Sequence, residues 1–292
     1  MTSMVYEFPE LQGIMGHHYA KAANKPSAVA LAIEEHYLPK FADDVLPETL
    51  PGICVALADR LDSLTGLFAI NKTPTGDKDP FALRRQALGV LRILIEKELP
   101  VSLTELIDVA YQHLQDKIDN PDTQTALYDF FLDRLKAMYL AKGIPAKAFE
   151  AVAVNRPDSP FDFHQRLLAV VAFQKLPESE SLAQANKRVH NILSKNNSQQ
   201  QSDEIDASLL KEPAEKTLFE SLNSQQQKTK PLLEKHQYSA ALKSFAELKN
   251  PTDAFFDTVM VMSEDKALQA NRLSLLQHLR SLFLKVADIS LL

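Results

Sequence analysis

Glycine is scarce in this sequence. The chain holds only 7 glycines in 292 residues, and none follows Gly143. A β-rich fold needs glycine at more of its turns than this, so we expect the second half to consist of helix after helix. Hydrophobic residues make up 45% and charged residues 24%, the balance of an ordinary folded protein. The length suits two or three domains of roughly 100–150 residues each.

Other features that the chain lacks narrow its chemistry. The single cysteine, Cys54, excludes an internal disulfide and a Cys-x-x-Cys metal site, and it fits a reducing cytosol. No apolar run approaches the roughly 20 residues that span a bilayer, and the first residues lack the basic and apolar regions of a secretory signal. A phosphate-binding Gly-x-x-x-x-Gly-Lys loop is also missing. We therefore expect a cytoplasmic protein without membrane contact and without an adenylation site of its own.

Positive charge is concentrated in one stretch of an acidic chain. The formal net charge is −6, yet residues 72–97 contain six basic side chains against three acidic ones. The basic ones are Lys72, Lys78, Arg84, Arg85, Arg92 and Lys97. An acidic total argues against indiscriminate binding of nucleic acids, whereas a local positive face suits one polyanionic partner.

The same stretch predicts a long amphipathic helix. Asp79 is placed to accept hydrogen bonds from the N–H groups of the first turn, and Pro80 suits the first helical position because it has no N–H to satisfy. Apolar side chains then recur at helical spacing, which predicts an inward face made of Leu83, Leu88, Leu91 and Leu94. The arginines between them are left to the rim or to solvent.

Helical patterns cover most of the remaining chain. Ser102 is the expected N-cap of the next helix, with Glu105 at the spacing of a capping box. Gly143 is expected to end the helix that precedes it. Ser263 is expected to cap the final helix, with two acidic residues in the first turn. The polar stretch 196–204 predicts a loop.

Several strings carry a more specific signal because they are long, free of gaps and arranged in a characteristic order. They are EFPELQGIMG at 7–16, ADRLDSLTGLF at 58–68 with the loop and helix that follow it, ANKRVHNIL at 185–193, DAFFDTVMVMSEDKALQANRL at 253–273 and ADISLL at 287–292. In these strings the sequence resembles the beta subunit of bacterial glycyl-tRNA synthetase. The resemblance covers most of the chain.

The resemblance implies an all-α fold in three parts. These are an HD-like helical region at 1–98, incomplete at its amino end, a helical middle segment at 99–180 and a DALR-type anticodon-binding domain at 181–292. In the family the first of these residues lie well inside a longer subunit, so we expect the chain to be a carboxyl-terminal portion. Apolar residues near its start, such as Phe8 and Ile14, are then expected to pack against segments not included here.

The resemblance also implies a function. In the family the beta subunit binds tRNA(Gly) and positions it for ATP-dependent aminoacylation, in an assembly of two alpha and two beta chains. Glycine activation takes place on the separate alpha subunit, so ATP and Mg²⁺ are expected there and no cofactor is expected on this chain. The chain thus acts as part of an aminoacyl-tRNA synthetase, with tRNA(Gly) and the alpha subunit as partners and with no role for DNA or a membrane.

The chemistry of tRNA indicates which residues would carry this function. Phosphates call for Arg and Lys, and the unstacked bases of the anticodon call for amides or guanidinium groups that form paired hydrogen bonds. The candidates on the anticodon side, all within strings shared with the family, are Lys187, Arg188, Asn271 and Arg272. Those on the acceptor side are Lys78, Arg84 and Arg85.

Each candidate has a structural alternative. A basic side chain is often only solvated, or it forms an ion pair that holds two elements together. Arg272 has Asp257 and Asp265 nearby in the sequence. In the same way, Arg84 and Arg85 are candidates for pairing with the acidic residues of the preceding helix, Asp59 and Asp62.

Two other functions remain as alternatives. HD-type phosphohydrolases hold a metal ion with a His, a His-Asp pair and a later Asp, and Asp59 stands where this last ligand is expected. The chain contains no His-Asp dipeptide, and the adjacent side chains of His17 and His18 diverge by about 100° on a helix, so they are poorly placed to chelate one ion. The other alternative is a helical protein-interaction scaffold, whose binding would not depend on tRNA or on salt.

Overall fold

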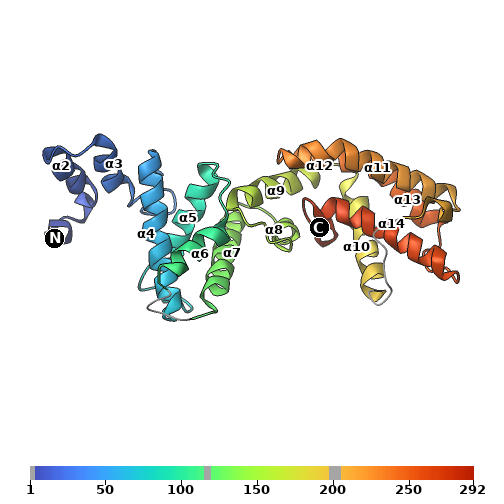
Figure 1. The fold of residues 1–292 in the computed structure, drawn as a ribbon, viewed down its shortest axis with the longest axis horizontal. Helices are drawn as coiled ribbons and strands as arrows, with labels where there is room; N and C mark the ends of the chain where they lie inside the picture. Colours follow the sequence, from blue (N-terminus) through green and yellow to red (C-terminus); the bar gives the residue numbers. More distant parts are fainter. Residues whose placement is uncertain (1–3, 115–119, 197–204) are drawn as a thin grey trace. The chain divides into compact units, whose positions relative to one another are not determined.

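The computed structural model describes residues 4–114, 120–196 and 205–292, and these residues form α-helices and short 3₁₀ turns. Within this part of the chain no strand is present, only an isolated bridge between Thr75 and Lys78. The predicted all-α class is confirmed (Figure 1). None of the described helices is long and apolar enough to cross a membrane. Most of the predicted polar loop at 196–204 lies outside the described residues.

The chain divides into two compact units. Unit 1 contains Met1–Lys142 and Asp158–Phe161, and unit 2 contains Gly143–Pro157 and Asp162–Leu292. Residues of the predicted middle segment, 99–180, belong to both units, and the predicted division into three parts stays a prediction.

Unit 1 is built around a long helix that contacts most of the others. Its elements are α1 (Met4–Glu7), η1 (Pro9–Leu11), α2 (Ile14–Ala22), α3 (Ser27–Glu35), α4 (Leu50–Ala69), α5 (Leu83–Glu96), α6 (Leu103–Gln112) and α7 (Thr123–Ala141). Helix α4 packs against α3, α5, α6 and α7. Leu64, Leu91 and Phe131 are fully buried among these helices, so the apolar stripes read from the sequence meet in one core. Phe8 and Ile14 remain exposed near the start of the unit.

The helix starts of unit 1 follow local rules, with one correction. The Ser102 hydroxyl accepts a hydrogen bond from the Glu105 N–H at 2.9 Å, so the predicted cap of α6 is confirmed. Helix α5 begins at Leu83, and Pro80 does not occupy its first position. The Asp79 carboxylate nevertheless accepts from the N–H groups of Leu83 and Arg84, at 2.8 and 3.0 Å. The loop continues past Pro80 and bends back, which lets an acid four residues upstream cap the helix.

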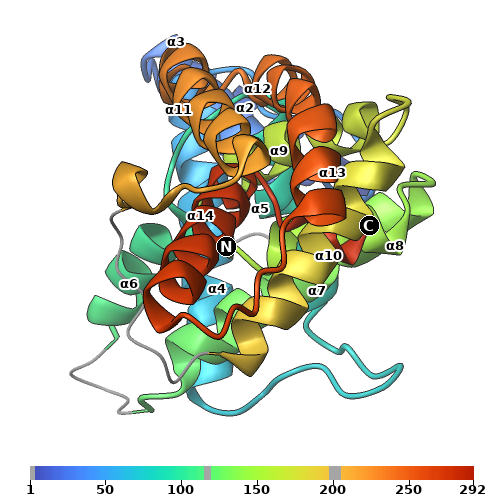
Figure 2. The ribbon, with the colours of Figure 1, turned by 90° about the vertical axis from the view of Figure 1, so that its right-hand side faces the viewer.

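Unit 2 is a bundle in which α10, α11, α13 and α14 pack together (Figure 2). Its elements are α8 (Ala146–Ala153), α9 (Pro160–Phe173), α10 (Ser179–Lys195), η2 (Ala207–Leu209), α11 (Pro213–Glu234), α12 (Tyr238–Phe245), η3 (Ala246–Leu248), α13 (Lys249–Thr258), α14 (Lys266–Leu284) and η4 (Ile289–Leu291). Leu275, Leu276 and Leu279 of α14 have no exposed surface. This last helix therefore forms the centre of the unit.

The start of α14 corrects a second prediction. Its N-cap is Asp265, whose carboxylate accepts from the N–H groups of Ala267 and Leu268 at 2.9 and 3.3 Å. Ser263 lies two residues earlier, and its hydroxyl accepts from the Asp265 N–H instead. Both residues are good caps, and an aspartate next to the first turn is also favoured by the positive end of the helix dipole.

Candidate nucleic-acid interface

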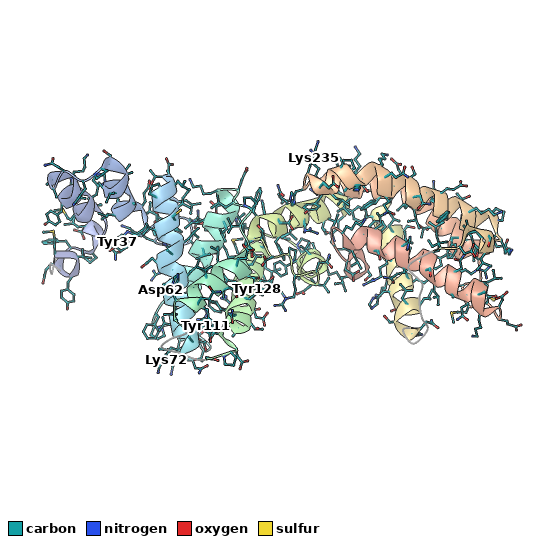
Figure 3. All side chains as sticks on the ribbon, viewed as in Figure 1. Tyr37, Asp62, Lys72, Tyr111, Tyr128 and Lys235 are labelled. Atoms are coloured by element: carbon teal, nitrogen blue, oxygen red, sulfur yellow. The ribbon has the colours of Figure 1, made fainter. Side chains whose placement is uncertain are left out.

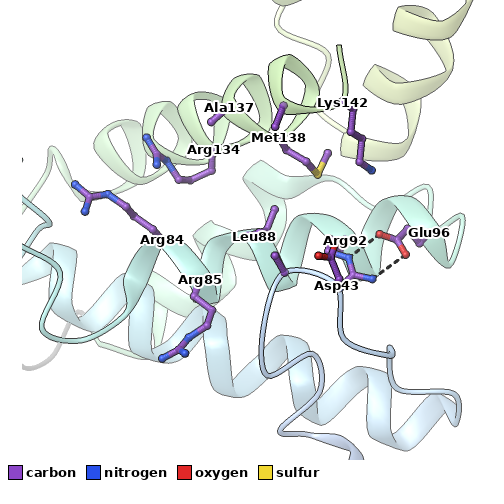
Figure 4. A pocket seen from close by; sticks show the side chains of 12 residues that line it. Asp43, Arg84, Arg85, Leu88, Arg92, Glu96, Arg134, Ala137, Met138 and Lys142 are labelled. Atoms are coloured by element: carbon purple, nitrogen blue, oxygen red, sulfur yellow. Dashed lines mark hydrogen bonds and ion pairs between the residues drawn. The ribbon is translucent and has the colours of Figure 1, made fainter. Parts of the chain in front are cut away.

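A pocket of about 570 Å³ opens in unit 1 between α5, α7 and the segment before α4 (Figure 4). We call it the α5–α7 pocket. Five basic side chains line it, namely Arg84, Arg85, Arg92, Arg134 and Lys142. Two acidic side chains, Asp43 and Glu96, share the lining, so positive charge prevails in a chain whose net charge is −6. The wall between the cations is apolar and includes Leu88 and Met138.

Helical spacing explains how these side chains reach one pocket. Arg84, Leu88 and Arg92 are four residues apart on α5, and Arg134 and Met138 are four apart on α7, so each set lies on one face of its helix. The two faces oppose each other across the pocket (Figure 4). The sequence predicted Leu88 on the inward face, whereas it is half-buried and lines the pocket between Arg84 and Arg92. Nothing in the sequence indicates that α7 lies opposite.

Arg92 is held by internal partners. Its Nε atom lies 2.7 Å from Glu96 Oε1, and Nη1 donates to the Asp44 carbonyl at 2.9 Å. The hydrogen bond with Glu96 raises the pKa of Arg92, and the same bond lowers the pKa of the Glu96 carboxyl. This pair forms a fixed, nearly neutral end of the pocket.

Arg84 and Arg85 do not form the predicted ion pairs. In the part of the chain that the structure describes, neither guanidinium pairs with Asp59 or Asp62. Arg84 instead donates to the Gly76 carbonyl, and Arg85 is exposed. Both guanidinium groups therefore remain available to an anion, as a binding role requires.

Arg134 was not predicted, and its geometry is unusual. Its Nε atom is buried and has no hydrogen-bond partner among the described residues. Its guanidinium carbon lies 5.6 Å from the centroid of the Phe130 ring. A buried N–H group without an acceptor costs about 1–3 kcal/mol. Arg84 and Arg134 extend toward the same end of the pocket (Figure 4).

Lys78 lies apart from the pocket lining. It is exposed in the loop before α5, where its N–H donates to the Thr75 carbonyl at 2.9 Å. The structure therefore does not bring it together with Arg84 and Arg85 in the pocket.

In unit 2 the candidates Lys187 and Arg188 are exposed on α10. The Arg188 guanidinium carbon lies 4.3 Å from the centroid of the Phe256 ring on α13. This stacking holds the guanidinium plane in place while leaving it accessible. Phe256 belongs to the family-matching string at 253–273, but nothing in the sequence indicates that it contacts Arg188.

Asn271 and Arg272 have internal roles. They are only 6% and 7% exposed. Asn271 accepts from the Asp206 N–H at 2.8 Å and donates to the Asp206 carbonyl at 3.0 Å. Arg272 pairs with Glu215 at 2.5 Å and donates to the Met260 carbonyl at 2.8 Å. Its partner is thus neither Asp257 nor Asp265, and Asn271 and Arg272 have little exposed surface to offer a tRNA.

Comparison with known proteins agrees with the resemblance. The sequence profile of the family "Glycyl-tRNA synthetase beta subunit" matches residues 1–154, which is more than half of the chain. This chain belongs to the glycyl-tRNA synthetase beta-subunit family. The profile of the DALR anticodon binding domain matches residues 182–289, most of unit 2.

Individual members of the family align along the whole chain. The glycine–tRNA ligase beta subunits of Coxiella burnetii (strain RSA 331) and Marinobacter nauticus are each 50% identical over 292 residues, and that of Hahella chejuensis is 49% identical over 291. These alignments cover all of this chain and 42% of each relative. The chain therefore spans less than half the length of the beta subunits that it matches.

Each of the two cationic sites described above lies within residues matched by one of the two family profiles. The α5–α7 pocket lies within the residues matched by the beta-subunit profile, and the stack of Arg188 on Phe256 lies within those matched by the DALR profile.

The residues near Asp59 do not fit an HD-type metal site. Asp59 is exposed, and among the described residues no group of three His, Cys, Asp or Glu side chains is placed to hold a metal ion. The adjacent Arg60 is 6% exposed, and burial lowers its pKa. Its guanidinium donates to the carbonyls of His36, Tyr37 and Pro39 at 2.9–3.2 Å. A buried cation beside Asp59 thus ties α4 to the preceding segment, and it would repel a metal ion.

Proposed function

We propose that this chain is the tRNA-binding portion of a glycine–tRNA ligase beta subunit and that it positions tRNA(Gly) for aminoacylation. The observation that supports this most strongly is the identity of about half of all residues to named beta subunits along the entire chain. The match of unit 2 to an anticodon-binding domain supports tRNA as the ligand.

The proposal divides the work between subunits. The alpha subunit supplies ATP- and Mg²⁺-dependent activation of glycine, and this chain binds RNA in an assembly of two alpha and two beta chains in the cytoplasm. Binding that brings the 3′ end of the tRNA to a remote active site accelerates the reaction because it turns a bimolecular encounter into an oriented one. This chain itself supplies no adenylation chemistry.

Two surfaces of the chain carry the proposed contacts. Lys187 and Arg188 form the anticodon side, and the half-buried Arg84 together with the exposed Arg85 and Lys78 forms the acceptor side. Asn271 and Arg272 act indirectly, because they fix the segments around Asp206, Glu215 and Met260 in place. The roles of these residues toward tRNA are proposals that follow from exposure, charge and family membership.

A binding measurement tests the proposed function. Fluorescence anisotropy with the 292-residue chain and labelled tRNA(Gly) is expected to show saturable binding that weakens steeply as salt rises, because bound phosphates release counterions. A tRNA with another anticodon is the matched competitor and is expected to bind more weakly. Equal affinity for both tRNAs would contradict cognate recognition. Binding that is insensitive to salt would instead favour the scaffold alternative.

A further inference from the structure

We propose that the α5–α7 pocket binds a single unpaired nucleotide, with its phosphate at Arg84 and Arg134 and its base against the apolar wall. The proposal deepens the function proposed above and rests on it for the source of the nucleotide, which is a bound RNA. Neither family profile assigns a ligand to this pocket.

The cation-rich end of the pocket fits a phosphate group. Arg84 donates one hydrogen bond to the Gly76 carbonyl and keeps its other N–H groups for a ligand. Arg134 has a buried Nε atom without an acceptor within the described residues. Both guanidinium groups extend toward this end (Figure 4). A phosphate there would accept charge-assisted hydrogen bonds from both guanidinium groups.

The apolar wall distinguishes a nucleotide from an inorganic anion. Leu88, Ala137 and Met138 lie between the two ends of the pocket and are at least partly exposed. A phosphate ion gains nothing from such a surface, whereas the flat face of a base buries apolar area against it. The cavity of about 570 Å³ is also far larger than one small anion needs, and it falls within the usual size of small-ligand sites.

The concave shape distinguishes an unpaired nucleotide from a duplex. The backbone of a double helix presents phosphates along a convex surface, and a row of exposed cations is sufficient to bind it. In this pocket the cations stand on two helices that face each other, so the ligand must enter between them. A base that is paired and stacked within a helix has no face to offer the apolar wall.

Calorimetry with 5′-AMP, adenosine and inorganic phosphate tests the pocket directly. We expect the 292-residue chain to bind 5′-AMP roughly tenfold more tightly than phosphate or adenosine, because only the nucleotide reaches both the cations and the wall. Equal binding of 5′-AMP and phosphate would overturn the proposal and leave only a general anion site.

Two variants separate the two parts of the pocket. Ala137→Phe fills the apolar space and keeps every cation; since Ala137 is exposed, the fold should be preserved. Arg134→Met removes the charge and keeps the length of the side chain. Each is expected to weaken 5′-AMP binding roughly tenfold, while Lys21→Met, which removes an exposed cation outside the pocket, leaves it unchanged. Unaltered 5′-AMP binding by Ala137→Phe, with circular dichroism confirming the fold, would contradict the proposal.

The same variants distinguish a failure of this proposal from a failure of the proposed function. If the wild-type chain binds tRNA(Gly) and Ala137→Phe binds it equally well, the chain is a tRNA-binding protein and the nucleotide proposal is wrong. If 5′-AMP binds in the expected pattern but tRNA(Gly) does not bind, the pocket takes free nucleotides and the proposed function is wrong. Weaker binding of both ligands by Ala137→Phe is the result that supports the two proposals together.

Discussion

Helices α5 and α14 both carry arginines and both include residues of family-matching strings, but their arginines have opposite surroundings. On α5, Arg84 and Arg85 lack an ion-pair partner within the described residues and border a pocket. On α14, Arg272 pairs with Glu215 and Arg280 pairs with Asp288, each at 2.5 Å. The comparison teaches that a basic residue in a conspicuous string is not evidence of a binding surface until its partners are known.

The cause of the difference is burial. Helix α14 is covered on most sides, and Arg272 is flanked in the sequence by buried Asn271 and Leu273. A guanidinium in such a place must be paired, since an unpaired buried charge is very costly. Helix α5 buries only one face, so its other face leaves arginines to solvent. Lys235, beyond the end of α11, shows the same freedom at the surface of unit 2 (Figure 3).

The largest expected effect is the loss of a buried pair. Arg272→Met should destabilise the chain by about 3–5 kcal/mol, because Glu215, only 1% exposed, is left charged without its partner. Arg188→Met is the matched control, for which we expect a change within about 0.5 kcal/mol. Urea unfolding followed by circular dichroism measures both. Similar stability of the two variants would break the contrast between internal and surface arginines.

A second cluster of internal charged side chains, around Asp162, makes the stability of the chain depend on pH. Asp162 accepts hydrogen bonds from Tyr238 and Arg166 at 2.5 and 2.6 Å. Burial by itself would raise the pKa of Asp162, but the hydrogen bonds from Tyr238 and Arg166 outweigh it, so the pKa lies below its ordinary value. The resulting stabilisation is present above the unfolded pKa of about 3.9 and is lost as the pH falls through the folded value.

Asp162→Asn should therefore cost about 1–3 kcal/mol at neutral pH and should flatten the fall in stability on acidification. Thermal unfolding at pH 7 and at several values below pH 4 tests this. Asp59→Asn, an exposed carboxylate, is the control and should follow the wild-type curve. An acid profile of Asp162→Asn identical to the wild type would show that other carboxylates govern the transition.

A smaller effect is expected for the exposed residues Lys187 and Arg188 of unit 2. Their replacement should change tRNA binding and leave stability unaltered. The double variant Lys187→Met, Arg188→Met should weaken binding of tRNA(Gly) about tenfold, because it removes two contacts to RNA of roughly 0.5–1 kcal/mol each. Lys235→Met removes one exposed charge of the same unit and should bind normally. Unfolding curves of both should match the wild type. Unchanged binding by the double variant would exclude Lys187 and Arg188 from the interface.

The smallest expected effect belongs to Arg85, at the rim of the α5–α7 pocket. Arg85→Met should weaken tRNA(Gly) binding only about threefold. The salt dependence of tRNA binding by Arg85→Met is the more specific measurement. The loss of one phosphate contact reduces the slope of log K against log salt concentration by about one. A weaker affinity with an unchanged slope would indicate that Arg85 does not contact a phosphate.

Helix caps were predictable from the sequence where a single side chain and a nearby backbone N–H group form the cap. Ser102 caps α6 as predicted, and Asp79 caps α5 even though that helix begins three residues later than Pro80. The prediction for α14 was wrong because Ser263 and Asp265 are both competent caps, and the choice between them depends on how the preceding loop packs. When two neighbouring residues can both cap a helix, tertiary contacts decide which one does, and the local sequence does not show these contacts.

The candidate site was less predictable for a related reason. Arg84 and Arg85 were identified because they belong to a locally basic stretch in a string shared with the family, whereas Arg134 lies in an ordinary helix and lines the pocket only because α7 faces α5. The ring of Phe256 supports the guanidinium of Arg188, and no pattern in the sequence indicates this contact. Arg272 was a candidate for tRNA contact with an ion pair to Asp257 or Asp265 as the alternative, and its actual partner, Glu215, was missed because it is 57 residues away on another helix.

The sequence by itself determined the helical class, the family and local caps such as those of α5 and α6, because these depend on composition, on long matching strings and on side chains within about one turn of each other. The tertiary structure alone decided which cations are internal and which are accessible. That distinction depends on the acceptors brought near each guanidinium by helices distant in the chain, and burial makes pairing obligatory only once those helices have packed.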